Sequence, residues 1–197
     1  MKEHDALRHF EAMGNDYDPE GGLRGLFIAK EREAVISLLD TQPGEKILDA
    51  GCGNGYYTRL IARAGARPYG VDISPAMIMT LKREGLPGHV ADIMMLNLRR
   101  TFDKVLCSGA LEFVADPGMV LHNLLAHTSP GGKLILLAPR CSLGGIAYRV
   151  YHWAHGVHVT LFTRRELEKM LQGTGSEPGR CIHPHAIAMV IEFTRRF

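Results

Sequence analysis

The feature that most constrains this chain is an apolar run that ends in an acidic residue and then a loop with glycine at every second position, Ile47–Gly55. Glycine lets the backbone adopt positive φ and lets another group approach it closely. The helix-like residues that follow, 56–64, would present unpaired N–H groups and the positive end of a dipole in their first turn. The pattern predicts a buried strand, a loop built for close backbone approach, and a helix.

A second predicted strand, Arg67–Asp72, ends in a carboxylate of its own. An acidic residue at the tip of the second strand of a βαβ unit can accept hydrogen bonds from ribose hydroxyls. The two motifs together therefore predict a cofactor that contains a nucleoside. The alternative reading of the glycine loop is a tight strand–helix turn that binds nothing.

The spacing of the glycines argues against a nicotinamide dinucleotide. A dinucleotide loop reads G-x-G-x-x-G, and its third glycine lets the helix pack closely on the strand. This loop reads G-x-G-x-G, and Tyr56 occupies the position of that third glycine. Asp49 also precedes the loop, where its charge would repel a pyrophosphate. A nicotinamide-dependent oxidoreductase is therefore the disfavoured alternative.

Strand-like and helix-like segments alternate along residues 46–139, and most of the apolar runs show no alternation with polar residues. This pattern is typical of a parallel sheet covered by helices on both faces. Right-handed crossovers place the carboxyl ends of the strands at one edge of such a sheet, where ligands bind. Asp49, Asp72, Asp92 and Ser108 each follow a predicted strand, so we expect all four at that edge.

Five motifs, in order, resemble those of the class I S-adenosylmethionine-dependent methyltransferases. They are Leu48–Gly55, Val71–Ser74, Ala91–Ile93, Phe102–Ser108 and Pro130–Leu136. The resemblance is nearest to the small-molecule branch that includes quinone-biosynthesis methyltransferases. It implies a doubly wound α/β fold with a seven-stranded, mostly parallel sheet whose last strand is antiparallel. The final two strands are expected near residues 180–183 and 186–193.

The activity that the resemblance implies is transfer of a methyl group from S-adenosylmethionine to a small-molecule acceptor, leaving S-adenosylhomocysteine. The attacked atom, O, N or C, stays open. A protein that binds the cofactor without turnover is the alternative, because no catalytic side chain stands out. The resemblance also implies a set of cofactor-contacting residues. They are Asp49, Gly51, Cys52, Gly53, Asn54, Gly55, Asp72, Ile73, Asp92, Ile93, Ser108 and Gly109.

Several of these residues have a second reading on local grounds. Asp72 and Asp92 could each cap a helix, and Ile73 could belong to the core instead of lying against an adenine. Asp49 is expected to be buried and to shape the loop, since an unpaired charge there would be costly. Cys52 is expected to fill space in the loop and not to act as a nucleophile.

The acceptor pocket is assigned to residues 1–25 and 140–162 of a single domain that spans 1–197, because the family uses these parts of the chain for its acceptors. The second segment concentrates aromatic residues and histidines. The residues expected to contact the acceptor are Tyr17, Tyr148, Tyr151 and Trp153.

Three histidines in the same segment, His152, His155 and His158, are candidate general bases because histidine titrates near neutral pH. The plainer reading is a helix on the edge of the sheet with its histidines exposed. A metal site is disfavoured, because a helix would turn His158 away from the other two.

Composition argues against several other classes of protein. A net charge of +2 over 197 residues gives no basic surface for nucleic acid. The apolar runs are far shorter than the ~20 residues that cross a bilayer, and no secretory signal is visible. Four scattered cysteines without a C-x-x-C pair are typical of reduced thiols, so we expect a cytoplasmic protein. Residues 30–33, within a predicted amphipathic helix 23–39, are expected to form mostly a solvated face.

Overall fold

A computed structural model describes residues 22–197. It contains one seven-stranded sheet with the order β3-β2-β1-β4-β5-β7-β6. The strands are β1 (Lys46–Ala50), β2 (Arg67–Asp72), β3 (Gly88–Val90), β4 (Phe102–Ser108), β5 (Thr128–Pro139), β6 (Ser176–Ile182) and β7 (Ala188–Arg195). The helices are α2 (Gly22–Leu39), α3 (Tyr56–Arg63), α4 (Pro75–Arg83), α5 (Pro117–Ala126), α6 (Leu143–Ala154) and α7 (Arg164–Met170), with short 3₁₀ turns η1 (Ile93–Met95) and η2 (Leu111–Phe113).

The sheet has the topology expected from the sequence. Strands β3, β2, β1, β4 and β5 run parallel to one another. The last strand, β7, pairs antiparallel with both β5 and β6. The predicted doubly wound, mostly parallel sheet with an antiparallel last strand is confirmed. The bounds predicted for β6 were too short, because its first half, Ser176–Gly179, is an exposed edge without an apolar pattern.

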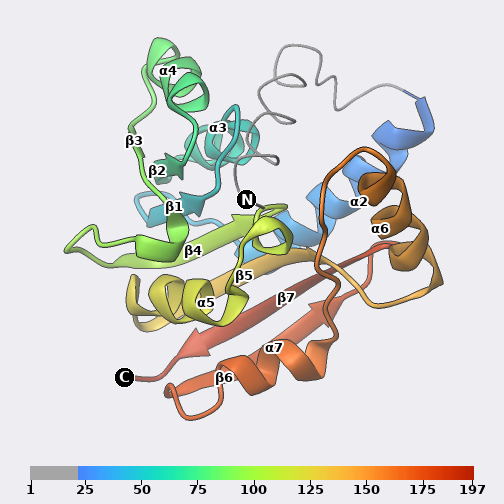
Figure 1. The fold of residues 1–197 in the computed structure, drawn as a ribbon. Helices are drawn as coiled ribbons and strands as arrows, with labels where there is room; N and C mark the ends of the chain where they lie inside the picture. Colours follow the sequence, from blue (N-terminus) through green and yellow to red (C-terminus); the bar gives the residue numbers. More distant parts are fainter. Residues whose placement is uncertain (1–21) are drawn as a thin grey trace.

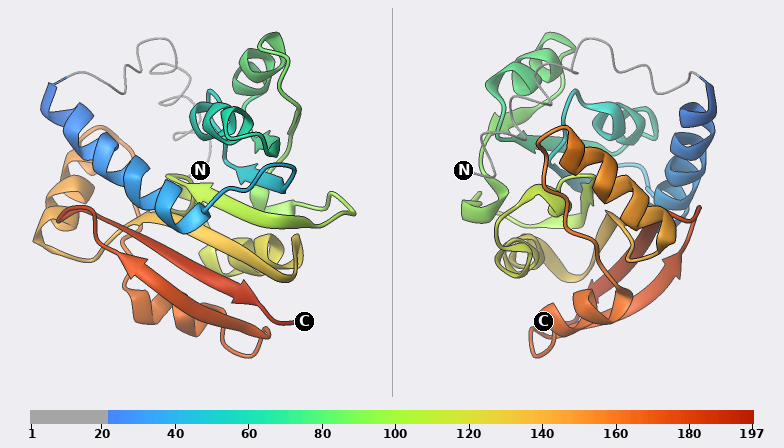
Figure 2. Two further views of the ribbon diagram at one scale, coloured as in Figure 1. Left: turned by 180° about the vertical axis from the view of Figure 1, so that it is seen from behind. Right: turned by 45° about the vertical axis from the view of Figure 1, so that its right-hand side comes forward.

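Helices cover both faces of the sheet (Figures 1 and 2). On one face α5 and α7 pack against β1, β4 and β5 in the larger core, to which Leu121, Leu124 and Leu167 belong. On the other face α2 and α3 form a second core through Val35, Leu38 and Ile61. Because the central strands are buried on both sides, consecutive residues in their buried parts are apolar, as in Leu134–Ala138 of β5.

Local signals in the sequence set the start of several helices. The hydroxyl of Ser74 accepts a hydrogen bond from a backbone N–H of the first turn of α4, and Pro75 follows it. Asp116 caps α5 in the same way. Thr163 and Glu166 form a capping box at the start of α7. Each cap satisfies N–H groups that have no partner within the helix.

The segment between β5 and α7 lies at the carboxyl end of the parallel strands. Arg140 forms a bridge with Phe162, and the hydroxyl of Ser142 donates to the carbonyl of Ala186 in the loop between β6 and β7. These contacts hold α6 at the same end of the sheet as the first half of α2 (Figures 1 and 2). None of the helices within residues 22–197 has the length and apolar character needed to cross a membrane.

Candidate functional site

Four neighbouring strands, β3, β2, β1 and β4, end at one edge of the sheet. The residues at or just after these ends include Asp92, Asp72, Asp49 and Ser108. The carboxyls of Asp49 and Asp72 lie near enough to interact, since the charge of Asp72 contributes to a raised pKa at Asp49. The structure thus brings the predicted acidic strand tips to a common place.

Asp72 joins the second strand tip to the glycine loop. One of its carboxylate oxygens accepts a hydrogen bond from the N–H of Gly53 at 2.8 Å, and the other accepts one from the N–H of Ser74 at 2.9 Å. Burial raises the pKa of Asp72, and these backbone N–H groups oppose that shift. A carboxylate oxygen can accept more than one hydrogen bond, so both oxygens keep capacity for ribose hydroxyls.

The glycine loop needs its glycines for two different reasons. Gly51 has φ +74°, and a side chain there would overlap Ala110, which follows β4. Gly53 has φ +52° but faces open space, since a Cβ there would meet nothing within 4 Å. The first glycine therefore permits close packing between two loops. The second leaves its backbone accessible to a bound molecule.

Asp49 is buried beneath this loop, with 1% of its surface exposed. The hydroxyl of Thr58, on α3, donates to its carboxylate at 2.6 Å. Burial raises the pKa of Asp49 to about 6, and the bond from Thr58 opposes the shift. Cys52 is also buried and packs with Ile78 and Leu81 of α4, and burial raises the pKa of its thiol. It packs as the expected space-filling residue.

The apolar residues assigned to the cofactor fall into two environments. Ile73, beside Asp72, is 44% exposed and could lie against a flat ligand. The side chain of Ile93 is only 7% exposed and belongs to the larger core, so only its backbone faces the edge. Asp92 accepts a hydrogen bond from the N–H of Met94 at 2.8 Å, which makes it the cap of η1.

The remaining predicted positions are loop backbone. Asn54 uses its carbonyl to accept a hydrogen bond from the Arg59 guanidinium at 2.8 Å. Gly55, with φ +88°, begins α3. Gly109 has φ +66° and follows Ser108 in the turn after β4, where it is exposed.

A buried carboxyl that sequence reasoning missed, Glu112, lies in η2 directly after this turn. It is 4% exposed, and burial raises its pKa to about 8, with the charge of Glu31 as a further cause. The only sequence signal was a single acidic residue in an apolar run, Gly109–Val114.

Glu31, on α2, is half-buried and not part of a fully solvated face, so that expectation was wrong for this residue. Its carboxylate is 2.8 Å from Nε2 of His185, in the loop between β6 and β7. Burial raises the pKa of Glu31 to about 7. The sequence placed these two residues 154 positions apart, so neither a motif nor a helical period could join them.

The predicted acceptor residues lie on two sides of α6. The rings of Tyr148 and His152 are tilted against each other with centroids 4.4 Å apart, and the ring of His152 lies 6.5 Å from that of Phe113 in η2. This side of α6 therefore faces the strand-tip edge. His152 is buried, against the expectation of an exposed histidine, while Tyr151 is exposed and packs its ring against that of His155 at 4.5 Å.

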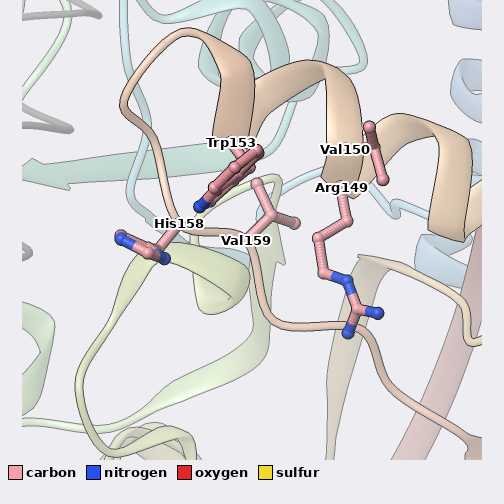
Figure 3. Close-up of a pocket in the computed structure, with 5 residues that line it drawn as sticks. All are labelled: Arg149, Val150, Trp153, His158 and Val159. Atoms are coloured by element: carbon pink, nitrogen blue, oxygen red, sulfur yellow. The ribbon is translucent and has the colours of Figure 1, made fainter.

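The opposite side of α6 borders a pocket of about 250 Å³, lined by Arg149, Val150, Trp153, His158 and Val159 (Figure 3). Trp153 points in a different direction from Tyr148 and His152, because it lies five and one positions from them on the helix, whereas His158 lies beyond the end of α6. The three candidate histidines do not converge. Tyr17 lies outside the described residues. Within residues 22–197 no group of His, Cys, Asp or Glu has an arrangement that could hold a metal ion.

Both the family model and the curated relative that match this chain are described as methyltransferases. A family model described as a methyltransferase domain matches residues 26–178. The chain is 31% identical over 137 residues to the ubiquinone biosynthesis O-methyltransferase of Coxiella burnetii (strain Dugway 5J108-111), a match that covers 65% of this chain and 58% of that protein. The chain thus spans less than two thirds of the length of this curated relative.

Solved structures of methyltransferases share the fold. The magnesium protoporphyrin IX methyltransferase of Synechocystis PCC 6803, with S-adenosylhomocysteine bound, superposes with a TM-score of 0.79 at 19% identity, covering 99% of this chain and 100% of that one. The 1,6-didemethyltoxoflavin-N1-methyltransferase of Burkholderia thailandensis gives a TM-score of 0.73 at 18% identity, covering 98% and 88%.

Proposed function

This chain belongs to the methyltransferase-domain family, and on that premise we propose that it transfers a methyl group from S-adenosylmethionine to a small-molecule acceptor. The observation that carries the proposal is the bond between Asp72 and the N–H of Gly53. It places an acidic strand tip and an accessible glycine backbone side by side, as binding of a ribose beside a close-packed loop requires.

The residues at the edge fit the parts of that cofactor in order along the sheet. Asp72 would accept hydrogen bonds from the ribose, and the half-exposed Ile73 would cover one face of the adenine, with Asp92 near its edge. Gly51, Cys52, Gly53, Asn54 and Gly55 would pass beneath the cofactor, with Asp49 holding their shape from below. The methionine end would extend across β1 toward Ser108 and Gly109, because β4 is the next strand in the sheet.

The sulfonium of S-adenosylmethionine makes its methyl group electrophilic, so the protein chiefly has to align the acceptor and exclude water. The acceptor side is assigned to residues 1–25 and 140–162. Tyr148 and His152 are the members of that set that face the strand tips, and Tyr151 lies next to them. Among the three candidate histidines, His152 therefore has the best claim to contact an acceptor.

The names of the relatives favour a small, flat acceptor. One relative is a ubiquinone biosynthesis O-methyltransferase, and two structural neighbours are named for magnesium protoporphyrin IX and 1,6-didemethyltoxoflavin. A cytoplasmic location is part of the proposal. It is supported by Cys52, Cys107, Cys141 and Cys181, none of which forms a disulfide.

Isothermal titration calorimetry with S-adenosylhomocysteine and, separately, with NAD tests the cofactor assignment. Wild-type protein should bind the former and not the latter. Asp72→Asn should weaken the binding at least about tenfold, because the amide accepts hydrogen bonds at only one of its two positions. Glu33→Gln, an exposed change on α2, is the matched control and should leave affinity unchanged. Equal affinity of wild type and Asp72→Asn would remove the ribose placement.

Turnover separates an enzyme from a protein that only binds the cofactor. Release of S-adenosylhomocysteine from S-adenosylmethionine, followed with catechol-type and amine acceptors, should exceed the rate without protein. Affinity for S-adenosylhomocysteine with no release for any acceptor of either class would favour the binding-only alternative.

A further inference from the structure

Glu112 lies between the two halves of the proposed active site. Two residues before it, Ala110 packs on Gly51 of the cofactor loop. One residue after it, the ring of Phe113 faces His152 of the acceptor segment, and the carbonyl of Glu112 itself accepts a hydrogen bond from the N–H of Thr160 at 2.9 Å. The short turn that carries Glu112 is thus held from both sides.

The carboxyl of Glu112 is buried, and no cationic side chain of residues 22–197 pairs with it. Within residues 22–197 its Oε2 has no hydrogen-bond partner, and no ion pair involves it there. The titratable groups around it are Glu31 on α2 and Cys107 on β4, with His152 of α6 beyond Phe113. Burial raises the pKa of Glu112 to about 8, the nearby Glu31 charge adds to the shift, and its own backbone N–H opposes it.

Glu31 is oriented by a short chain of hydrogen bonds. The N–H of Ile187 donates to Nδ1 of His185 at 3.2 Å, so Nδ1 carries no proton. The proton of the neutral ring must then sit on Nε2, which donates to the Glu31 carboxylate at 2.8 Å. Burial lowers the pKa of His185, which keeps the ring neutral. The hydrogen bond from His185 therefore fixes one carboxylate oxygen of Glu31. The other carboxylate oxygen has no hydrogen bond or ion pair with residues 22–197.

We propose that Glu112 is the proton acceptor of the methyl transfer and that the acceptor is a neutral hydroxyl compound. A lone pair of the hydroxyl oxygen forms the new O–C bond while the C–S bond breaks and its electron pair stays on sulfur. The hydroxyl proton passes to Glu112. This inference rests on the proposed function and adds a residue and an acceptor class to it.

The charge of the cofactor would change the pKa of Glu112 in the course of the reaction. A positive sulfonium near the end of β4 would favour the carboxylate form of Glu112, because an opposite charge at ~5 Å lowers the pKa of a carboxyl by roughly 1 unit. Methyl transfer removes that positive charge, so the pKa of Glu112 returns to its raised value. Glu112 is thus mostly ionised when the acceptor binds and holds a proton more tightly once the methyl group has moved.

The number of protons released when the cofactor binds tests the role of Glu112, and this measurement does not require the acceptor to be known. At pH 7.5 Glu112 in the free protein should be about three-quarters protonated, and beside the sulfonium only about one-quarter. Binding of S-adenosylmethionine should therefore release about half a proton more than binding of S-adenosylhomocysteine, which lacks the charge. Titration calorimetry of both compounds in phosphate and in Tris, which differ in ionisation enthalpy, measures this difference.

Variants test whether the proton released on binding of S-adenosylmethionine comes from Glu112. Glu112→Gln should abolish the difference between the two compounds, Glu112→Asp should keep most of it, and the exposed control Glu33→Gln should leave it unchanged. A wild-type difference of zero, or a difference that survives in Glu112→Gln, overturns the inference. If Glu112→Gln does not fold, Glu31→Gln should still reduce the release, and an unchanged value would count against the proposal. Failure of both compounds to bind wild-type protein would instead reject the proposed function.

Discussion

Replacing Glu112 by Gln should change how stability depends on pH, apart from any effect on function. The unfolded carboxyl titrates near 4.5, and the folded one at about 8. Between these values the folded state holds a proton that the unfolded state has lost, so the free energy of unfolding falls as pH rises. One such group contributes a slope of about 1.4 kcal/mol per pH unit, or about 4 kcal/mol in total by pH 8.

Glutamine has nearly the same shape and no charge, so the variant should lack this part of the slope. An unpaired buried amide costs roughly 1–3 kcal/mol, but that cost is the same at every pH. The variant should therefore be no more stable than wild type at pH 5 and more stable at pH 8. Asp49 and Glu31, with pKa values of about 6 and about 7, leave a residual slope of the same sign in both proteins.

Urea unfolding at half-unit steps from pH 5 to 8.5, at constant ionic strength, measures the difference. The exposed control Glu33→Gln should follow wild type throughout. Parallel curves for wild type and Glu112→Gln would show that the carboxyl titrates normally in the folded state. That result would refute the argument from burial.

Three other changes give further tests. Gly51→Ala should lower the free energy of unfolding by about 2–4 kcal/mol, because the alanine would have a positive φ and its Cβ would overlap Ala110. Gly131→Ala also has a positive φ but faces open space, so it should lower the free energy of unfolding by only about 1 kcal/mol. Equal losses of the two variants in urea unfolding would rule out the overlap. Thr58→Val removes the donor to buried Asp49 and should cost about 1–3 kcal/mol, with a larger loss at pH 8 than at pH 5; a cost that is independent of pH would show that Asp49 stays protonated. His158→Ala changes an exposed side chain and should leave the turnover number within about twofold of wild type, so a loss of about 100-fold or more would restore this histidine as a general base.

The sequence predicted those parts of the fold that depend on local pattern. Buried strands, caps such as Thr163 with Glu166, and the glycine loop each leave a signal within a few residues. The edge that gathers Asp49 and Asp72 could be predicted too, because right-handed crossovers place all parallel strand ends on one side. The first half of the edge strand β6 could not, since it is exposed and has no apolar period.

Parts of the candidate site depend on contacts distant in sequence, and these were missed. Glu31 looked like part of a charged helix face, and only the fold brings His185 to it. In the sequence, Glu112 is a single acidic residue within an apolar run. This pattern is the same for a buried carboxyl and for an exposed one. Ile93 matched a motif, yet the 3₁₀ turn after Asp92 directs its side chain into the core.

The most direct test of the whole account is a crystal structure of the protein with S-adenosylhomocysteine. We predict that both ribose hydroxyls lie within hydrogen-bond distance of the Asp72 carboxylate, with the adenine beside Ile73 and the sulfur toward Glu112. An adenosyl group bound elsewhere, for example in the pocket beside Trp153, would contradict the claim that the strand tips of this sheet hold the methyl donor.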